Sequence, residues 1–370
     1  MKSIVQEVLS RAKGRTEVRE SPTEIGGYSA DDAELERVLA GLKTNIKIIG
    51  IGGAGSNTID RLVEAGVLGA ELYAANTDAQ HLLVVRSPNK ILLGRRSTRG
   101  LGAGALPQVG EEAAREAEEE LRASLQGGDM VFITCGLGGG TGTGGAPFIA
   151  SLAREMGALT IAICTLPFRA EGAIRTENAE YGLEKLRNFT DTVIVIPNDK
   201  LVELVPRLSL NAAFKVADEV LMRAIKGVTE IITKPGLVNL DFNDIKTVMK
   251  GGGVAMIGLG ESSDSDMRSE EAIESAINSP LVDVDISSAS GALVNVTGGS
   301  DMSVGEAEKV AEILQSRINP NARIIWGAVV DPSLEDRMRV MLIVTGVKSK
   351  QIFGPARMAR EEVTGIDVVH

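Results

Sequence analysis

The chain has 370 residues, of which 44% are hydrophobic and 24% charged, a composition typical of a globular protein with two or three domains. Its formal net charge of -11 argues against a nucleic-acid binder, which would present a basic face. The N-terminus lacks the apolar core of a signal peptide, and no stretch is long and apolar enough to span a bilayer, so we expect no direct membrane insertion.

Residues 1–44 are predicted to form a helical extension, because Ile4, Val5 and Val8 recur on one helical face. From Asn45 onward, strands alternate with helices. The predicted strands span residues 46–51, 71–75, 90–93, 130–134, 159–165 and 192–196. The predicted helices include residues 111–125, 146–156 and 177–187, with Pro147 near a first helical position. The alternation predicts an α/β fold with a parallel, Rossmann-like sheet over residues 45–208.

Residues 209–233 are predicted to form one long central helix, since apolar residues from Phe214 to Ile232 recur at helical spacing. Residues 234–347 alternate less regularly and predict a smaller α+β domain. Its predicted strands lie near residues 254–260, 292–297, 323–329 and 338–344, and its helices near 267–278 and 303–318. Residues 348–370 form a short tail.

Cysteine and histidine are rare in this chain. Cys135 and Cys164 fall at the ends of predicted strands, so we expect buried thiols in a reducing compartment. His81 and His370 cannot supply a metal-ligand set, and we predict no metal site built from protein side chains. We expect His81 on a helix surface and not as a catalytic base.

The most informative motif is the run Gly-Gly-Gly-Thr-Gly-Thr-Gly at residues 138–144. Its five glycines remove every Cβ that would keep a ligand away from the backbone. The run lies between a predicted strand and a predicted helix, where backbone N–H groups and the helix dipole favour an anion such as phosphate. A flexible loop is the weaker alternative, because linkers are rarely placed between a core strand and a helix.

Further loops follow the other predicted strands, at residues 50–57, 76–78, 166–175 and 197–200. The carboxyl ends of parallel strands share one edge, so these loops predict one ligand site. The first loop matches G-x-G-x-x-G and Asp78 follows the next strand, a pattern that suggests an NAD-dependent oxidoreductase. That interpretation leaves the 138–144 run without a function.

A P-loop hydrolase requires a lysine after its glycines, and neither loop has one, so backbone dipoles, hydroxyls and a cation must handle the phosphate charge.

These motifs, in this order, resemble the FtsZ form of the tubulin/FtsZ family over residues 45–347. The resemblance is carried by the 138–144 run, in which Thr143 stands where tubulins usually have Ser, and by residues 52–57, 75–80, 100–105, 197–200 and 239–244. The helical extension and short ending are closer to archaeal than to bacterial members. The resemblance implies a tubulin/FtsZ GTPase domain joined by the central helix to the α+β domain.

The resemblance also assigns residues to GTP or GDP. The phosphate-binding and base-proximal positions of the two glycine-rich loops match Gly53, Ala54, Gly55, Ser56, Asn57, Gly140, Thr141, Gly142 and Thr143, with Asn57 in reach of the base edge. Ala103 and Gly104 match the loop that senses the γ-phosphate. The family's ribose, phosphate and base contacts match Glu171, Arg175, Asn198, Phe214 and Asp218.

Phe214 would stack on guanine, and Asp218, one helical turn later, could accept hydrogen bonds from guanine N1–H and its 2-amino group. Adenine offers no such pair of donors, which favours GTP over ATP. Taken without the resemblance, the two residues are more simply a core aromatic and a solvated acid on one helix.

Asn239, Asp241 and Asp244 match the family's catalytic loop. Two acids three residues apart are also typical of a helix N-terminus, and Asp244 could cap a helix that begins at Ile245. The central helix would span about 30 Å, so these acids cannot reach the γ-phosphate of their own subunit. We expect them to act on the GTP of the next subunit in a head-to-tail filament. Asn243 stands where bacterial members often have Ala.

The resemblance therefore implies a self-assembling GTPase that forms the cytokinetic ring in the cytoplasm, at the division site. Its partners would be further copies of itself and a membrane-tethering division protein. We expect Mg²⁺ to bind mainly through phosphates and water, with Asp78 as an outer-shell contact. Two alternatives stay open: a GTP-binding filament or scaffold paralogue with weak hydrolysis, and the NAD-dependent oxidoreductase.

Overall fold

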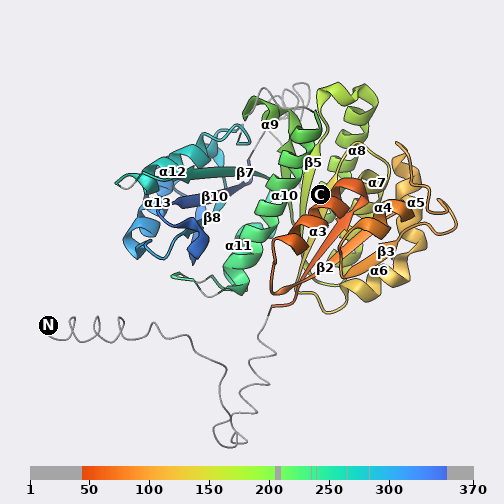
Figure 1. The fold of residues 1–370 in the computed structure, drawn as a ribbon, viewed down its shortest axis with the longest axis horizontal. Helices are drawn as coiled ribbons and strands as arrows, with labels where there is room; N and C mark the ends of the chain where they lie inside the picture. Colours follow the sequence, from red (N-terminus) through yellow and green to blue (C-terminus); the bar gives the residue numbers. More distant parts are fainter. Residues whose placement is uncertain are drawn as a thin grey trace, which may run out of the picture. The chain divides into compact units, whose positions relative to one another are not determined.

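The structure is a computed structural model that describes residues 44–347, except 205–209, 235, 239, 265 and 283. The predicted tail and all but Thr44 of the predicted N-terminal extension lie outside the described residues. Within the described part, one sheet of ten strands has the order β3-β2-β1-β4-β5-β6-β7-β10-β8-β9 (Figure 1).

The first part of the sheet is parallel, as predicted. Its strands are β1 (Ile46–Ile51), β2 (Ala70–Asn76), β3 (Asn89–Leu92), β4 (Met130–Gly136), β5 (Leu159–Leu166) and β6 (Thr192–Pro197). Its helices are α3 (Gly52–Glu64), α4 (Ala79–Val84), α5 (Pro107–Glu116), α6 (Glu118–Leu125), α7 (Thr141–Glu155), α8 (Ala173–Phe189) and α9 (Asn198–Leu204).

The second part begins with α10 (Leu210–Thr233), the predicted central helix, followed by α11 (Phe242–Met249). The remaining long elements are β7 (Gly253–Ser262), α12 (Arg268–Ile277), β8 (Gly291–Gly298), α13 (Val304–Arg317), β9 (Arg323–Val330) and β10 (Met338–Thr345). β7 pairs in parallel with β6, so the sheet continues from one part into the other, and β10 then pairs antiparallel with β7 and β8.

Buried strands supply side chains to both faces of the sheet. In β1, Ile46 and Ile48 pack on one face, whereas Ile49 and Ile51 pack on the other, as the alternation of a strand requires. The first face is covered by α3, α10 and α11, and the second by α5 to α8. The core around α10 includes side chains from both parts of the sheet, which makes this helix the structural link between them. Figure 1 shows α10 between the two parts.

Two predicted helix boundaries are wrong. Helix α7 begins at Thr141, inside the glycine run, and Pro147 lies within the helix instead of near its first position. The glycines allow this early start because α7 packs so closely on α5 that a Cβ on Gly144 would lie 1.8 Å from the carbonyl oxygen of Pro107. The helix predicted at residues 111–125 is divided into α5 and α6 at Ala117.

Candidate nucleotide site

A cavity of about 540 Å³ opens at the carboxyl ends of β1, β2, β4, β5 and β6. The loops after these strands line it, together with residues near the start of α10. Six separate loops, including residues 101–104 after β3, and one helix therefore converge on one site, as the order of the sheet requires. The volume lies within the range of small-molecule sites in proteins.

Most of the predicted nucleotide residues line this cavity: Gly53, Ala54, Ala103, Gly104, Gly140, Thr141, Gly142, Glu171, Arg175, Asn198, Phe214 and Asp218. Four predicted residues do not line it. Gly55 and Ser56 are buried in α3, and the buried Thr143 hydroxyl accepts a hydrogen bond from the backbone N–H of Gly138. Asn57 lies exposed on α3, with its side-chain oxygen 3.0 Å from His81 Nε2.

Two helix N-termini meet at the cavity, and neither has a side-chain cap. Helix α3 begins at Gly52 and α7 begins at Thr141. A Cβ on Gly52 would lie 3.0 Å from the backbone nitrogen of Gly142, which shows how closely the two first turns approach. The first N–H groups of a helix have no partner within the helix, and its dipole favours negative charge there. Together the two ends form an anion site suited to phosphate groups.

The glycines of the 138–144 run have two different functions. A Cβ on Gly142 or Gly144 would collide with backbone oxygens, at 2.6 Å from that of Gly136 and 1.8 Å from that of Pro107. These glycines allow close packing of α7. Gly139, by contrast, lines the cavity and has open space where a Cβ would be. Therefore only some glycines of the run, such as Gly139, leave space for a ligand to approach the backbone.

This division predicts different outcomes for two matched substitutions. Gly144→Ala should lower the free energy of unfolding by about 3 kcal/mol, because α5 and α7 must separate to admit the methyl group. Gly139→Ala should leave the free energy of unfolding nearly unchanged. Denaturant unfolding of both variants measures this, and equal losses of stability in the two would contradict the assignment.

The end of the cavity near α10 carries an aromatic and an acidic side chain. Phe214 is 38% exposed and contacts Phe168 edge to face, with ring centroids 5.1 Å apart. Asp218 is mostly buried, with Arg61 Nε 3.7 Å from its Oδ2. Desolvation raises the pKa of Asp218 to about 6, although the positive charge of Arg61 opposes the shift. Phe214 is thus not a core aromatic, and Asp218 is not a solvated acid.

Asn198, at the end of β6, adds an unsatisfied acceptor. The residue is 4% exposed and lines the cavity, and its side-chain oxygen has no hydrogen-bond donor among the described residues. A buried acceptor without a partner is unfavourable, so a donor on a ligand would relieve this cost.

An ion pair lies on the side of the cavity formed by the loop after β5. Arg175 Nη1 is 2.7 Å from Glu171 Oε2, and the other carboxylate oxygen of Glu171 accepts from the backbone N–H of Phe168. Glu171 is therefore held in place, while Arg175 remains half exposed at the edge of the cavity.

Several residues that line the cavity were not predicted from the sequence. Asn76 ends β2, and Thr77 and His81 follow it. The Thr77 hydroxyl is 2.6 Å from that of Thr141. The position of the 76–78 loop at a strand end was the available signal for the first two. His81 lies on α4, as predicted, but faces the cavity.

The acidic loop lies beyond the opposite end of α10. Between Phe214 and Thr233 this helix rises about 28 Å, at 1.5 Å per residue. Asp241 and Asp244 are exposed, and Asp241 Oδ1 accepts the backbone N–H of Asp244 at 2.9 Å. The cap of α11 is thus Asp241, and the prediction that Asp244 caps a helix from Ile245 is wrong. Asn239 lies outside the described residues.

Both cysteines are free and buried, as predicted, and desolvation raises the pKa of Cys135 to about 12. Over the described ranges, no three His, Cys, Asp or Glu side chains are grouped to hold a metal ion. No helix in the described part of the chain is long and apolar enough to cross a membrane.

Comparisons with known proteins agree with this geometry. A profile of the tubulin/FtsZ family GTPase domain matches residues 45–206, and one of the FtsZ family C-terminal domain matches residues 253–348. Cell division protein FtsZ 1 of Archaeoglobus fulgidus is 59% identical over 371 residues, covering 100% of this chain and 99% of the relative. Its namesake from Halobacterium salinarum strain R1 is 58% identical, covering 96% and 91%.

A solved structure of an empty FtsZ dimer from M. jannaschii has a TM-score of 0.82 and 55% identity, covering 86% of this chain and 93% of that chain. The fold is thus that of the tubulin/FtsZ class of GTPases. Within that class, the chain belongs to the FtsZ family.

Proposed function

We propose that this protein polymerises head to tail and hydrolyses GTP where two subunits meet, as the filament of a cytokinetic ring in cell division. The supporting observation is the placement of the site on α10. A nucleotide cavity lies at one end of this helix, and two exposed carboxylates follow its other end. A head-to-tail contact brings the two ends together and, because it does not close on itself, produces a filament.

In this proposal the nucleotide-binding residues are those of the two glycine-rich loops, with Ala103 and Gly104 near the γ-phosphate. The first turns of α3 and α7 hold the phosphates, and Arg175 adds positive charge beside them. Phe214 stacks on the base, and Asp218 accepts its donor groups. Asn239, Asp241 and Asp244 of the neighbouring subunit orient and polarise the attacking water. Phosphoryl transfer to water depends mainly on such positioning and charge stabilisation.

We also propose that Mg²⁺ accompanies the nucleotide and is bound mainly through phosphate oxygens and water. The carboxylate of Asp78, which lines the cavity, supports this mode, because Mg²⁺ prefers oxygen ligands and keeps several waters. One Asp78 oxygen accepts the backbone N–H of His81 at 3.0 Å, which leaves the other for an outer-shell water. Bound there, the cation would neutralise charge on the triphosphate.

The proposed place of action is the cytoplasmic division site, and a separate membrane-tethering protein would attach the filament. The names of the relatives as cell division proteins support this placement. The family match argues against the oxidoreductase alternative, and the carboxylates of Asp241 and Asp244 argue against a scaffold with weak hydrolysis.

The concentration dependence of hydrolysis tests the proposal. Because the site is completed by a neighbour, GTP turnover per subunit should rise steeply above a critical protein concentration. Phosphate release and light scattering with GTP, GDP and ATP would be followed in parallel. A turnover that is constant from dilute to concentrated protein would contradict the proposal.

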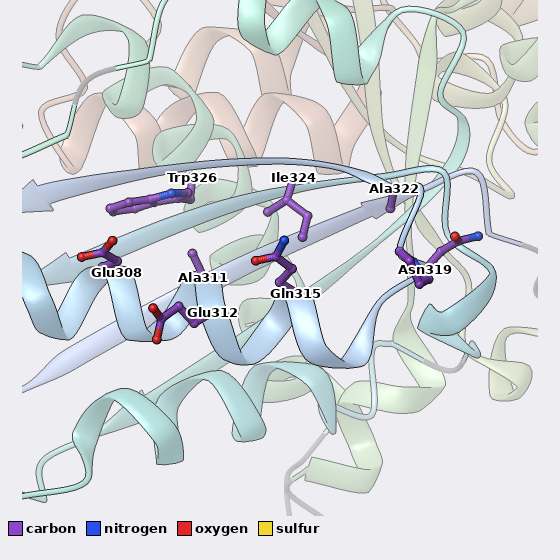
Figure 2. A pocket seen from close by; sticks show the side chains of 9 residues that line it. Glu308, Ala311, Glu312, Gln315, Asn319, Ala322, Ile324 and Trp326 are labelled. Carbon is purple, nitrogen blue, oxygen red and sulfur yellow. The ribbon is translucent and has the colours of Figure 1, made fainter.

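The tryptophan at position 326 offers a second test of assembly. A cavity of about 650 Å³ lies between α13 and the edge strand β9, where Trp326 and Ile324 of the strand face helix residues that include Glu308 and Glu312 (Figure 2). Val238, just before the acidic loop, pairs with Ala328 on the same strand. We therefore propose that this groove lies beside the contact with the next subunit.

Trp326 is the only tryptophan in the chain, so its emission reports on this groove alone. Assembly with GTP should change the intensity or wavelength of the emission, whereas GDP should not. Trp326→Phe serves as the control for signal from other sources. Unchanged emission in samples that scatter light as filaments would contradict a contact here.

A further inference from the structure

We propose that His81 is a positioning residue for nucleotide specificity: it orients the side-chain amide of Asn57 so that the amide NH₂ group donates to the acceptor edge of guanine. The inference rests on the proposed binding of GTP in this cavity. In this proposal His81 does not contact the base itself and acts on base recognition through Asn57.

The orientation follows from a chain of hydrogen bonds that begins at the backbone. The N–H of Asp78 donates to the side-chain oxygen of Asn76 at 3.2 Å, which fixes the Asn76 amide. The Asn76 nitrogen is then the atom 3.0 Å from His81 Nδ1, and an NH₂ group can only donate. Nδ1 is therefore an acceptor, and the ring carries its hydrogen on Nε2.

His81 in turn fixes the orientation of the Asn57 amide. The Nε2 hydrogen of His81 is donated to Asn57 Oδ1 at 3.0 Å. Because one end of the amide is held in this way, its NH₂ group points away from His81. The ring itself is placed by the start of α4, where Asp78 accepts the backbone N–H of His81 at 3.0 Å.

The position of Asn57 relates this donor to the base. Arg61 follows Asn57 by four residues on α3, so the two share a helix face. Arg61 contacts Asp218, the acid at the base end of the cavity. Asn57 thus lies beside the base end, and His81, which is in contact with Asn57, lines the same cavity.

The chemistry of the two purines explains why the orientation matters. Guanine has two acceptors, O6 and N7, on one edge, whereas adenine has a donor amino group in place of O6. An Asn57 amide held with its NH₂ group outward matches the guanine edge. A freely rotating amide could present its oxygen instead and would tolerate either base. Asp218 would accept hydrogen bonds from the donor edge of guanine. Asn57, oriented by His81, would donate to the acceptor edge.

Two GTP analogues isolate this edge: 6-thio-GTP weakens the acceptor at position 6, and 7-deaza-GTP removes the acceptor at position 7. Equilibrium binding of both, and of GTP, would be measured on the full chain and on His81→Leu, His81→Gln and Asn57→Ala. Glutamine keeps one acceptor and one donor at position 81, whereas leucine keeps only bulk. We expect the unmodified chain to bind at least one analogue about tenfold more weakly than GTP, as for the loss of one hydrogen bond.

His81→Leu should reduce the preference for GTP over this analogue from about tenfold to about threefold or less, and His81→Gln should restore it. Adding His81→Leu to Asn57→Ala should cause no further change, because the histidine acts through the amide. If His81→Leu weakens GTP and both analogues by equal factors, the residue is merely structural and the inference is wrong. If the unmodified chain does not distinguish GTP from either analogue, it is also wrong. Failure of the unmodified chain to bind GTP at all would instead contradict the proposed function.

Discussion

Asp241→Asn is expected to lower GTP turnover of the assembled protein by about 100-fold or more, while GTP affinity stays unchanged. A positioned general base contributes roughly 10²–10⁴ in rate, and the amide of asparagine cannot polarise the attacking water in this way. Affinity should not change, because the carboxylate belongs to the end of the subunit remote from its own nucleotide cavity. Phosphate release at a protein concentration well above the assembly threshold measures turnover, and equilibrium binding measures affinity.

The choice of asparagine separates catalysis from helix capping. Asp241 accepts the backbone N–H of Asp244 at the start of α11, and asparagine caps helices about as well as aspartate. Asp241→Ala removes both the cap and the charge, at a cost of about 1 kcal/mol in stability. If Asp241→Asn retains full turnover and only Asp241→Ala is impaired, then the residue is a cap and the catalytic assignment is wrong.

A mixing experiment tests whether the acid acts on a neighbouring subunit. Asp241→Asn subunits can bind GTP but lack the acid, whereas Phe214→Ala/Asp218→Ala subunits keep the acid but bind GTP poorly. Each variant alone should be nearly inactive. When mixed, a subunit of the first kind can place its GTP against the acidic loop of the second, and turnover should reappear. No recovery in mixtures that co-assemble would show that the acid acts within its own subunit.

The parallel sheet and the location of the cavity at one of its edges were predictable because they depend on strong local signals. Buried strands such as β1 and β4 are followed by glycine-rich loops, and parallel strands place those loops on one edge. The central helix was predictable for the same reason, since its apolar periodicity extends over about five turns.

Other features depend on contacts between distant residues and could not be predicted from the sequence. The early start of α7 depends on its packing against the backbone of α5, which no local pattern reveals. Pro147 suggested a later start because proline favours a first turn, yet the glycines before it already adopt the helix. The role of His81 required the three-dimensional approach of α3 and α4, since Asn57 lies 24 residues earlier in the chain.

The raised pKa of Asp218 also has a consequence for nucleotide recognition. Desolvation places this pKa near 6 in the nucleotide-free protein, above the ordinary value of 3.8. Between these two values the folded protein holds a proton that the unfolded chain has lost. The contribution of this group to stability is therefore full below about pH 4 and is lost as the pH rises through 6. At neutral pH the buried carboxylate is unfavourable, and two donors from guanine would offset that cost.

Asp218→Asn should weaken GTP binding by roughly 10- to 100-fold at pH 7.5, as for the loss of charge-assisted hydrogen bonds worth about 1.5–3 kcal/mol.

Guanine binds the carboxylate form, so the GTP affinity of the unmodified protein should fall as the pH decreases through 6. The difference in GTP affinity between the two proteins should then shrink. Titration of the GTP phosphates affects both proteins alike and cancels in the ratio of their affinities. Nucleotide-free Asp218→Asn should be at least as stable at pH 7.5, because a buried charge is gone. If the ratio of the GTP affinities of the unmodified protein and Asp218→Asn stays constant between pH 5.5 and 7.5, then Asp218 does not bind the base through its ionised carboxylate.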